Sequence, residues 1–122
     1  MPGFIINIED KSLKNDFFRE VLFTTPKSQL VVMSLRPGEE IGTEAHEKSD
    51  QFIRVEAGEG KAVLNGQTSN IEDGSAIVIP AGTEHNIINT SGESMKLYTL
   101  YTPPQHPDGT IHKTKAEAEK EG

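Results

Sequence analysis

Residues 74–89 read Gly74-Ser-Ala-Ile-Val-Ile-Pro80-Ala-Gly82-Thr-Glu-His85-Asn-Ile-Ile-Asn89. A short apolar run leads into a Pro/Gly turn, and a histidine opens the next apolar run. Runs of this length between Gly, Pro and Asn residues are typical of β-strands joined by tight turns. The stretch therefore predicts two consecutive strands, with His85 at the start of the second.

The same alternation of short apolar runs and turn residues extends over most of the chain. Asn65-Gly66 predicts the sharpest hairpin, because both residues tolerate positive φ. No run between residues 29 and 101 is long and periodic enough for a helix, although residues 13–19 predict one short helical turn. We expect an all-β sandwich or barrel with strands at residues 4–8, 20–24, 29–35, 51–57, 61–64, 75–79, 86–89 and 96–101.

The chain has 122 residues, which is the size of one domain. Residues 1–28 are expected to form N-terminal strands and the short helical turn, packed on a barrel or on a dimer partner. Residues 29–102 are expected to form the barrel, and residues 103–122 a C-terminal arm that leaves it. In this arm Thr114 and Glu117 fit a capping box for a marginal final helix. The predicted core comprises Val32, Ile53, Val55, Val63, Ile77, Ile79, Ile87 and Leu97.

The composition argues against several classes of function. The chain has no cysteine, which excludes disulfides, thiolate metal sites and cysteine nucleophiles. Its net charge is −7 and its basic residues are scattered, so nucleic acid is not expected as a partner. No apolar stretch approaches the roughly 18 residues of a membrane span, and no leader-like segment opens the chain. We therefore expect a soluble, cytoplasmic protein without membrane contact.

Four side chains are candidates for binding a metal ion. Glu44 and His46 are two residues apart, so they share one face of an extended segment. Residues 47–50 predict a turn, after which Gln51 begins a strand that can oppose this segment. His85 would have to come from the opposite sheet, which the spacing alone does not establish. Two imidazoles, a carboxylate and an amide oxygen suit divalent Mn, Fe, Co, Ni or Zn, and the spacing does not choose among them.

Two spaced motifs connect these candidates to a known family. Residues 74–89 match, at every fixed position, the pattern Gly, five residues, Pro-x-Gly, two residues, His, three residues, Asn. Upstream, Gly38, Glu44-x-His46, Gln51 and Gly58 match the spacing of Gly, five residues, His-x-His, three or four residues, Glu, six residues, Gly. In both respects the chain resembles a small single-domain cupin of the type-2, mannose-6-phosphate isomerase-like kind. The resemblance implies a cupin β-barrel of six to ten strands, also called a jelly roll or double-stranded β-helix.

Carried over by position, the resemblance implies a metal held by Glu44, His46, Gln51 and His85. Glu44 stands where the family has its first histidine, and Gln51 stands where it has glutamate. The site would thus exchange one nitrogen for oxygen and keep one negative charge. Glutamine also occurs at that position in some metal-binding cupins, including sugar-processing ones. In the purely structural alternative, the histidines and the amide satisfy backbone groups and Glu44 is a solvated carboxylate.

The leading hypothesis from this resemblance is a divalent transition metal in a barrel pocket that accepts a small oxygenated molecule, sugar-like or a carboxylate. Isomerase and dioxygenase chemistry are both open. The alternatives are a non-catalytic module that binds or senses a small molecule, and a site that has lost its metal. His106 and His112 are expected to be exposed and not to be ligands, unless the arm folds over the barrel mouth. The N-terminal strand and the sheet edges predict a homodimer.

Overall fold

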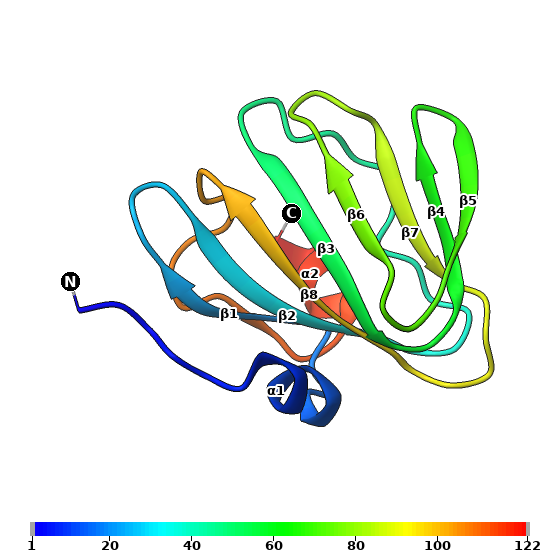
Figure 1. The fold of residues 1–122 in the computed structure, drawn as a ribbon, viewed down its shortest axis with the longest axis horizontal. Coiled ribbons are helices and arrows are strands. Elements are labelled where there is room, and N and C mark those ends of the chain that lie inside the picture. Colours follow the sequence, from blue (N-terminus) through cyan, green and yellow to red (C-terminus); the bar gives the residue numbers. More distant parts are fainter. Residues whose placement is uncertain (1, 122) are drawn as a thin grey trace.

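The computed structural model describes residues 2–121, which fold mainly into antiparallel β-strands (Figure 1). The described part contains two helices, α1 (Ile8–Lys14) and α2 (Lys115–Glu121), and neither is long and apolar enough to cross a membrane. Its nine strands are β1 (Arg19–Thr24), β2 (Gln29–Leu35), β3 (Asp50–Ala57), β4 (Gly60–Leu64), β5 (Gln67–Ile71), β6 (Ala76–Ile79), β7 (His85–Asn89), β8 (Met95–Thr102) and β9 (Ile111–His112).

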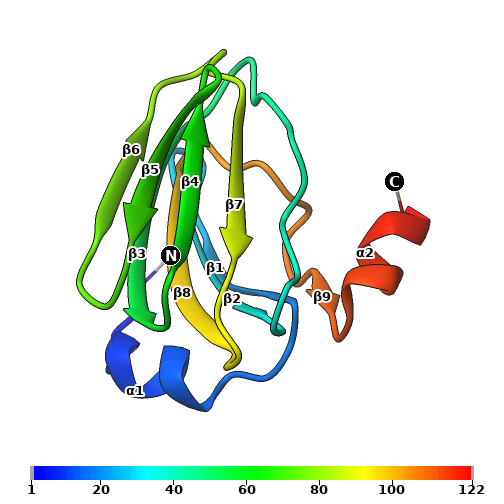
Figure 2. The same ribbon diagram turned by 90° about the vertical axis from the view of Figure 1, so that its right-hand side faces the viewer.

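The strands form two sheets that face each other (Figure 2). The larger sheet has the order β6-β3-β8-β2-β1-β9, and the smaller sheet has the order β5-β4-β7. The inner faces of the sheets enclose one apolar core, in which Val31, Leu35, Ile53, Ile87 and Leu97 have no exposed surface. Burial of apolar area between two sheets is the main stabilising term of such a fold. The all-β jelly roll expected from the sequence is confirmed.

The predicted strands from residue 20 onward lie within one residue of their expected bounds. The hairpin between β4 and β5 is also confirmed, with φ of 49° at Asn65 and 81° at Gly66. One core assignment is wrong, because Val63 is only half-buried. Ala62 is 3% exposed and pairs with Ile87 of β7, so it takes the inward position on β4. Side chains alternate along a strand, and the inward Ala62 therefore turns Val63 to the other face.

Within residues 1–28, the expectation of a first strand near the N-terminus is wrong. Residues 4–8 do not form a strand, and a helix begins at Ile8. The Asn7 side chain accepts a hydrogen bond from Asp10 N at 2.9 Å, and Glu9 and Asp10 occupy the first turn. This N-cap and the acidic first turn stabilise the helix locally and override the β-propensity of the preceding apolar residues. The helical turn predicted at residues 13–19 is displaced toward the N-terminus. The helix α1 begins at Ile8 and ends at Lys14.

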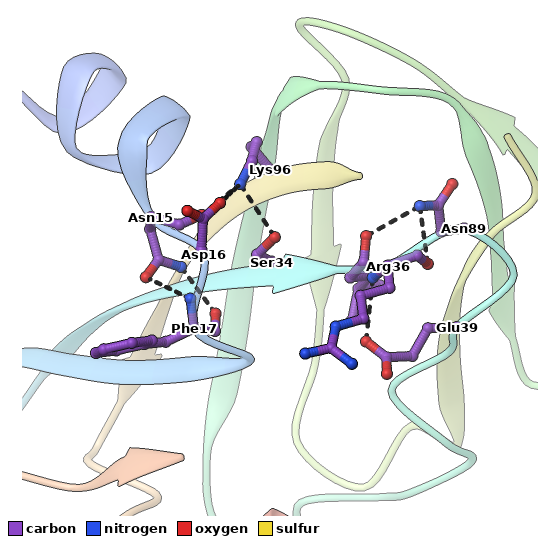
Figure 3. Close-up of polar contacts among 9 residues, drawn as sticks. Asn15, Asp16, Phe17, Ser34, Arg36, Glu39, Asn89 and Lys96 are labelled. Carbon is purple, nitrogen blue, oxygen red and sulfur yellow. Dashed lines mark hydrogen bonds and ion pairs between the residues drawn. The ribbon is translucent and has the colours of Figure 1, made fainter. Parts of the chain in front are cut away.

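Lys96 on β8 holds the loop after α1 against the larger sheet (Figure 3). Its ammonium group donates to Asp16 Oδ1 at 2.9 Å and to Ser34 Oγ at 3.2 Å, and it also reaches the carbonyl oxygen of Asn15. The hydrogen bond and the charge of Lys96 lower the pKa of Asp16 below its ordinary value. The start of β1 is therefore fixed relative to β2 and β8.

The C-terminal arm does not leave the barrel but folds back along its end. Gln29 is buried on β2, and its side chain donates to His106 O at 2.7 Å and accepts from Gln105 N and His106 N. Further on, β9 pairs with β1. One half of the capping box at α2 is confirmed, because Glu117 N donates to Thr114 Oγ1 at 3.2 Å, whereas Glu117 Oε1 accepts from Lys113 N at 2.8 Å. Figure 2 shows β9 and α2 beside the barrel, near the chain that precedes β3.

Candidate metal centre

Glu44 lies in the segment between β2 and β3, where it is paired with the first residue of β7. Glu44 N donates to His85 O at 3.0 Å, and His85 N donates to Glu44 O at 2.8 Å. The expectation that this segment pairs with the Gln51 strand is therefore wrong. Both edges of β3 are already occupied, by β6 and β8. The segment crosses to the smaller sheet instead, so that His85 is a neighbour of Glu44 and Gln51 comes from the other sheet.

The side chains of Glu44, His46 and His85 converge. Glu44 Oε1 lies 3.2 Å from His46 Nε2 and 3.7 Å from His85 Nε2. One ligand atom from each of the three residues lies within 4.8 Å of the others, and the two imidazole centroids are 5.2 Å apart. Nitrogen and oxygen ligands lie about 2.0–2.2 Å from a bound Zn²⁺, so neighbouring ligands of one ion are roughly 3–4 Å apart. The three groups therefore have the spacing of a metal site.

The atoms that would coordinate a metal lack hydrogen bonds. His46 Nε2 and His85 Nε2 are buried without a hydrogen bond, and their polar contact is Glu44 Oε1, at 3.2 Å and 3.7 Å. His85 Nδ1 lies 2.9 Å from Thr83 O, a carbonyl oxygen that can only accept a hydrogen bond. This contact places the His85 proton on Nδ1 and leaves the Nε2 lone pair directed toward Glu44. Such an outer hydrogen bond is the usual support of a metal-binding histidine.

Gln51 presents the same combination of one anchored atom and one unpaired atom. It is 3% exposed on β3, and its Nε2 donates to Thr99 Oγ1 at 3.0 Å. Its Oε1 is buried without a hydrogen-bond partner. Gln51 pairs with Tyr101 across β3 and β8, and the Tyr101 ring packs edge-on against His46, with 5.5 Å between centroids. The unpaired amide oxygen thus belongs to the same end of the barrel as the two histidines.

The charges of these groups depend on one another. Burial disfavours the ionised form of Glu44, but the adjacent His46 and His85 nitrogens outweigh this effect and lower the pKa of Glu44 to about 2. Burial likewise disfavours the charged form of His85, but the Glu44 carboxylate and the Thr83 carbonyl raise its pKa. Glu44 is therefore an anion at neutral pH, and it attracts either a proton on His85 or a metal cation. The donor set fits a divalent ion.

A cavity of about 450 Å³ adjoins this centre. Glu44 and His46 form part of its wall, and the arm closes it with residues that include His106 and His112. The expectation that these two histidines are exposed is wrong, because His112 is 5% exposed and His106 is half-buried. Burial, together with the Arg19 charge, lowers the pKa of His106 to about 4. His106 is therefore an uncharged imidazole at neutral pH, and its Nε2 lies 3.4 Å from Tyr101 Oη.

Arg19 is a site residue that sequence reasoning did not identify. It is 7% exposed at the start of β1, and it lines the same cavity. The available signal was the period of two: Arg19 and Val21 share a face of the strand, and both are buried. An arginine on the buried face of a strand is unusual and indicates a specific role.

A sequence profile of the family described as "Cupin domain" matches residues 31–101. This range covers more than half of the chain and includes both motifs and all four candidate ligands. The chain therefore belongs to the cupin family.

Similar proteins support this membership along nearly the whole chain. "Uncharacterized protein YrkC" of Bacillus subtilis is 48% identical over 122 residues, which cover 94% of this chain and 65% of that protein. "Uncharacterized protein L612" of Acanthamoeba polyphaga mimivirus is 46% identical over 112 residues, covering 88% of this chain and 70% of that protein. The chain thus spans about two thirds of the length of these relatives. The crystal structure of BH2720 from Bacillus halodurans has a TM-score of 0.95 and 44% identity, covering 98% of this chain and 95% of that one.

Proposed function

We propose that this cupin binds one divalent transition metal ion through Glu44, His46, Gln51 and His85, and that the ion helps to hold a small oxygenated molecule in the adjoining cavity. The observation that carries the proposal is the group of buried atoms without hydrogen bonds, two of them beside the Glu44 carboxylate: His46 Nε2, His85 Nε2 and Gln51 Oε1. Each unsatisfied buried polar atom costs about 1–3 kcal/mol. A cation placed among them would remove that cost, which supports a metal role over a purely structural one.

The residues of the site divide the chemistry among them. A bound metal supplies Lewis-acid polarisation of a substrate oxygen or an activated water. Glu44 provides the negative charge of the ligand set, while the Thr83 carbonyl and the Thr99 hydroxyl orient His85 and Gln51. His106 is uncharged and lines the cavity, so its imidazole can form a hydrogen bond with a bound molecule without adding a charge. Isomerase and dioxygenase chemistry are both compatible with these residues.

Metal analysis tests the proposal directly. Protein purified without chelators is analysed by inductively coupled plasma mass spectrometry, and its melting temperature is measured before and after EDTA treatment. We expect one equivalent of transition metal per chain and a lower melting temperature once the metal is removed. Glu44→Ala should lose the metal, whereas Glu47→Ala, which removes a nearby exposed carboxylate, should retain it. Absence of stoichiometric metal, with melting unaffected by EDTA, would reject the site.

A non-catalytic binding or sensing module is the second candidate, because the same metal and cavity would serve to hold a ligand. Turnover assays across sugar phosphates, uronates and catechols separate the two functions. Product formation that is lost in His106→Gln while metal content is unchanged would support catalysis. Saturable binding of one of these compounds without product would favour the module.

The homodimer stays a prediction, and its basis has changed. The N-terminal strand, one of its two grounds beside the sheet edges, is absent, but Phe4, Ile5 and Ile6 still expose apolar surface, and Ile5 is 98% exposed. Exposed apolar side chains in one segment are a feature of association surfaces. Sedimentation analysis of the parent protein and of Ile5→Asp tests this prediction: a dimer that dissociates in the variant supports it, and a monomeric parent contradicts it.

A further inference from the structure

Arg19 is a buried cation whose hydrogen-bonding capacity is mostly unused. Its Nη1 donates to His112 Nδ1 at 3.2 Å, because β9 places His112 directly opposite Arg19 on β1. The guanidinium carbon lies 5.2 Å from the centroid of the Phe18 ring. Its Nε is buried and has no hydrogen-bond partner. Among the side chains that the structure describes, residues 2–120, no carboxylate forms an ion pair with Arg19.

The unpaired part of the guanidinium has the shape of a carboxylate receptor. Nε–H and the neighbouring Nη2–H form one edge of the planar group, and two parallel hydrogen bonds from such an edge match the two oxygens of a carboxylate. The other edge is partly occupied, since Nη1 is directed to His112. The side chain is held in place by Phe18 and His112, so the free edge is fixed before any ligand arrives.

The charged residues that line the cavity around Arg19 also favour the binding of an anion. Arg19 and Lys115 both line the cavity, together with two carboxylates, those of Glu44 and Glu119. Glu44 is directed at the two histidines, and Glu119 is exposed to solvent. Neither carboxylate neutralises Arg19. Burying a cation without a counter-charge costs free energy, and a bound anion would offset that cost.

We infer that Arg19 anchors a carboxylate group of the molecule that occupies the cavity, and that the natural ligand is therefore an organic acid rather than a neutral sugar. The inference rests on the proposed function only for a second contact, between another oxygen of the ligand and the metal. The contact at Arg19 requires no metal. A ligand held at both ends would be oriented across the cavity, with its reacting part beside His106.

The direct test observes the Arg19 Nε–H group by ¹H–¹⁵N NMR during titration with sodium acetate. The chain has only three arginines, at positions 19, 36 and 54, so Arg36 and Arg54 serve as internal controls. The titration is performed on EDTA-treated protein, with sodium chloride at equal ionic strength as the reference. We expect a saturable shift of the Arg19 signal, with the signals of Arg36 and Arg54 unchanged. An Arg19 signal that moves no more than that of Arg54 overturns the inference.

Two further measurements identify the chemical group that causes the shift of the Arg19 signal. A saturable shift with inorganic phosphate but not with acetate would contradict the assignment to a carboxylate. Arg19→Gln should weaken acetate binding by about 10-fold or more, as expected when a charge-assisted pair is lost, while the matched exposed variant Arg54→Gln leaves it unchanged. Zinc binding to the same protein samples is measured separately by calorimetry. Loss of zinc binding would reject the proposed function alone, because the acetate titration does not depend on metal.

Discussion

His85 and Asn89 lie four residues apart on β7, both nearly fully buried, but their polar atoms have opposite fates. Asn89 Nδ2 donates to the carbonyl oxygens of Leu35, Arg36 and Glu93 at 2.7–3.1 Å, and its Oδ1 accepts from the backbone and hydroxyl of Ser91. Figure 3 shows part of this network beside Arg36. His85, at the other end of the strand, leaves Nε2 without a hydrogen bond, 3.7 Å from Glu44 Oε1.

This difference separates two reasons for burying a polar side chain. Asn89 replaces water with a complete set of protein hydrogen bonds, so it joins loops at its end of the barrel and needs nothing more. His85 is oriented just as firmly through Thr83, but the atom that faces Glu44 and His46 is left open. A buried polar side chain whose hydrogen bonds are all satisfied indicates a structural role. A side chain that is held in orientation but keeps an atom without a hydrogen bond indicates a binding site.

The largest expected effect comes from replacing His85, whose Nε2 makes no hydrogen bond. His85→Ala should weaken metal binding by about 1000-fold or more, because it removes one of four ligands and leaves Glu44 without one of its two partners. The unfolding free energy of the metal-free variant should change far less, since the orphaned nitrogen contributes little to folding. Calorimetric titration with Mn²⁺ and Zn²⁺ and urea unfolding of chelated protein measure the two quantities. Unchanged metal affinity would show that His85 is not a ligand.

Asn89, at the hydrogen-bonded end of β7, should respond to substitution in the opposite way. Asn89→Ala leaves the carbonyl oxygens of Leu35, Arg36 and Glu93 without their shared donor, which we expect to lower the unfolding free energy by about 3 kcal/mol. Metal affinity, measured on the fraction that is folded, should stay within about 2-fold of the parent, because His85 keeps its own support. A variant that loses metal binding but not stability would reverse the comparison.

Sequence reasoning recognised both residues but could not tell their roles apart. The alternation of apolar runs and turns placed β1 to β4 and β6 to β8 but not β9, and the motif spacing selected Glu44, His46 and His85, which lie together. What it missed depends on tertiary contacts. The pairing of Glu44 with His85 follows from which sheet edges remain free, and Arg19 becomes significant only when β9 and the arm enclose it.

Gln51 offers a finer test, because it combines a satisfied atom and an open one in a single side chain. Gln51→Leu removes the orphaned Oε1, but it also removes the hydrogen bond to Thr99. These effects oppose each other, so the stability of the metal-free protein should stay within about 1 kcal/mol of the parent. Metal affinity should fall by about 10–100-fold, which is smaller than the loss in His85→Ala because a neutral oxygen ligand is removed. Equal metal affinity in Gln51→Leu and the parent would show that the Gln51 amide, like that of Asn89, has a structural role only.

The smallest expected effect concerns His106, which extends the comparison to the arm. Its pKa is about 4 in the folded protein against 6.5 as the ordinary value, because burial and the nearby charges of Arg19, His46 and His112 disfavour the imidazolium, while Glu44 acts in the opposite direction. Between pH 6.5 and 4 the unfolded chain therefore binds more protons at this residue than the folded chain, so acidification lowers stability.

Because His106 is only half-buried, solvent screening reduces this contribution to the order of 1 kcal/mol between pH 7 and pH 4.5. His85 has the opposite sign in the metal-free protein: its raised pKa contributes stability below pH 6.5 that is lost as the pH rises through its folded value. The effect of His106 is therefore isolated as a difference between the chelated parent and His106→Gln, both unfolded by urea at pH 7 and pH 4.5. The parent should lose more stability on acidification than the variant. Equal losses would mean that the imidazole is already solvated in the folded state, and that the arm leaves the cavity open to water.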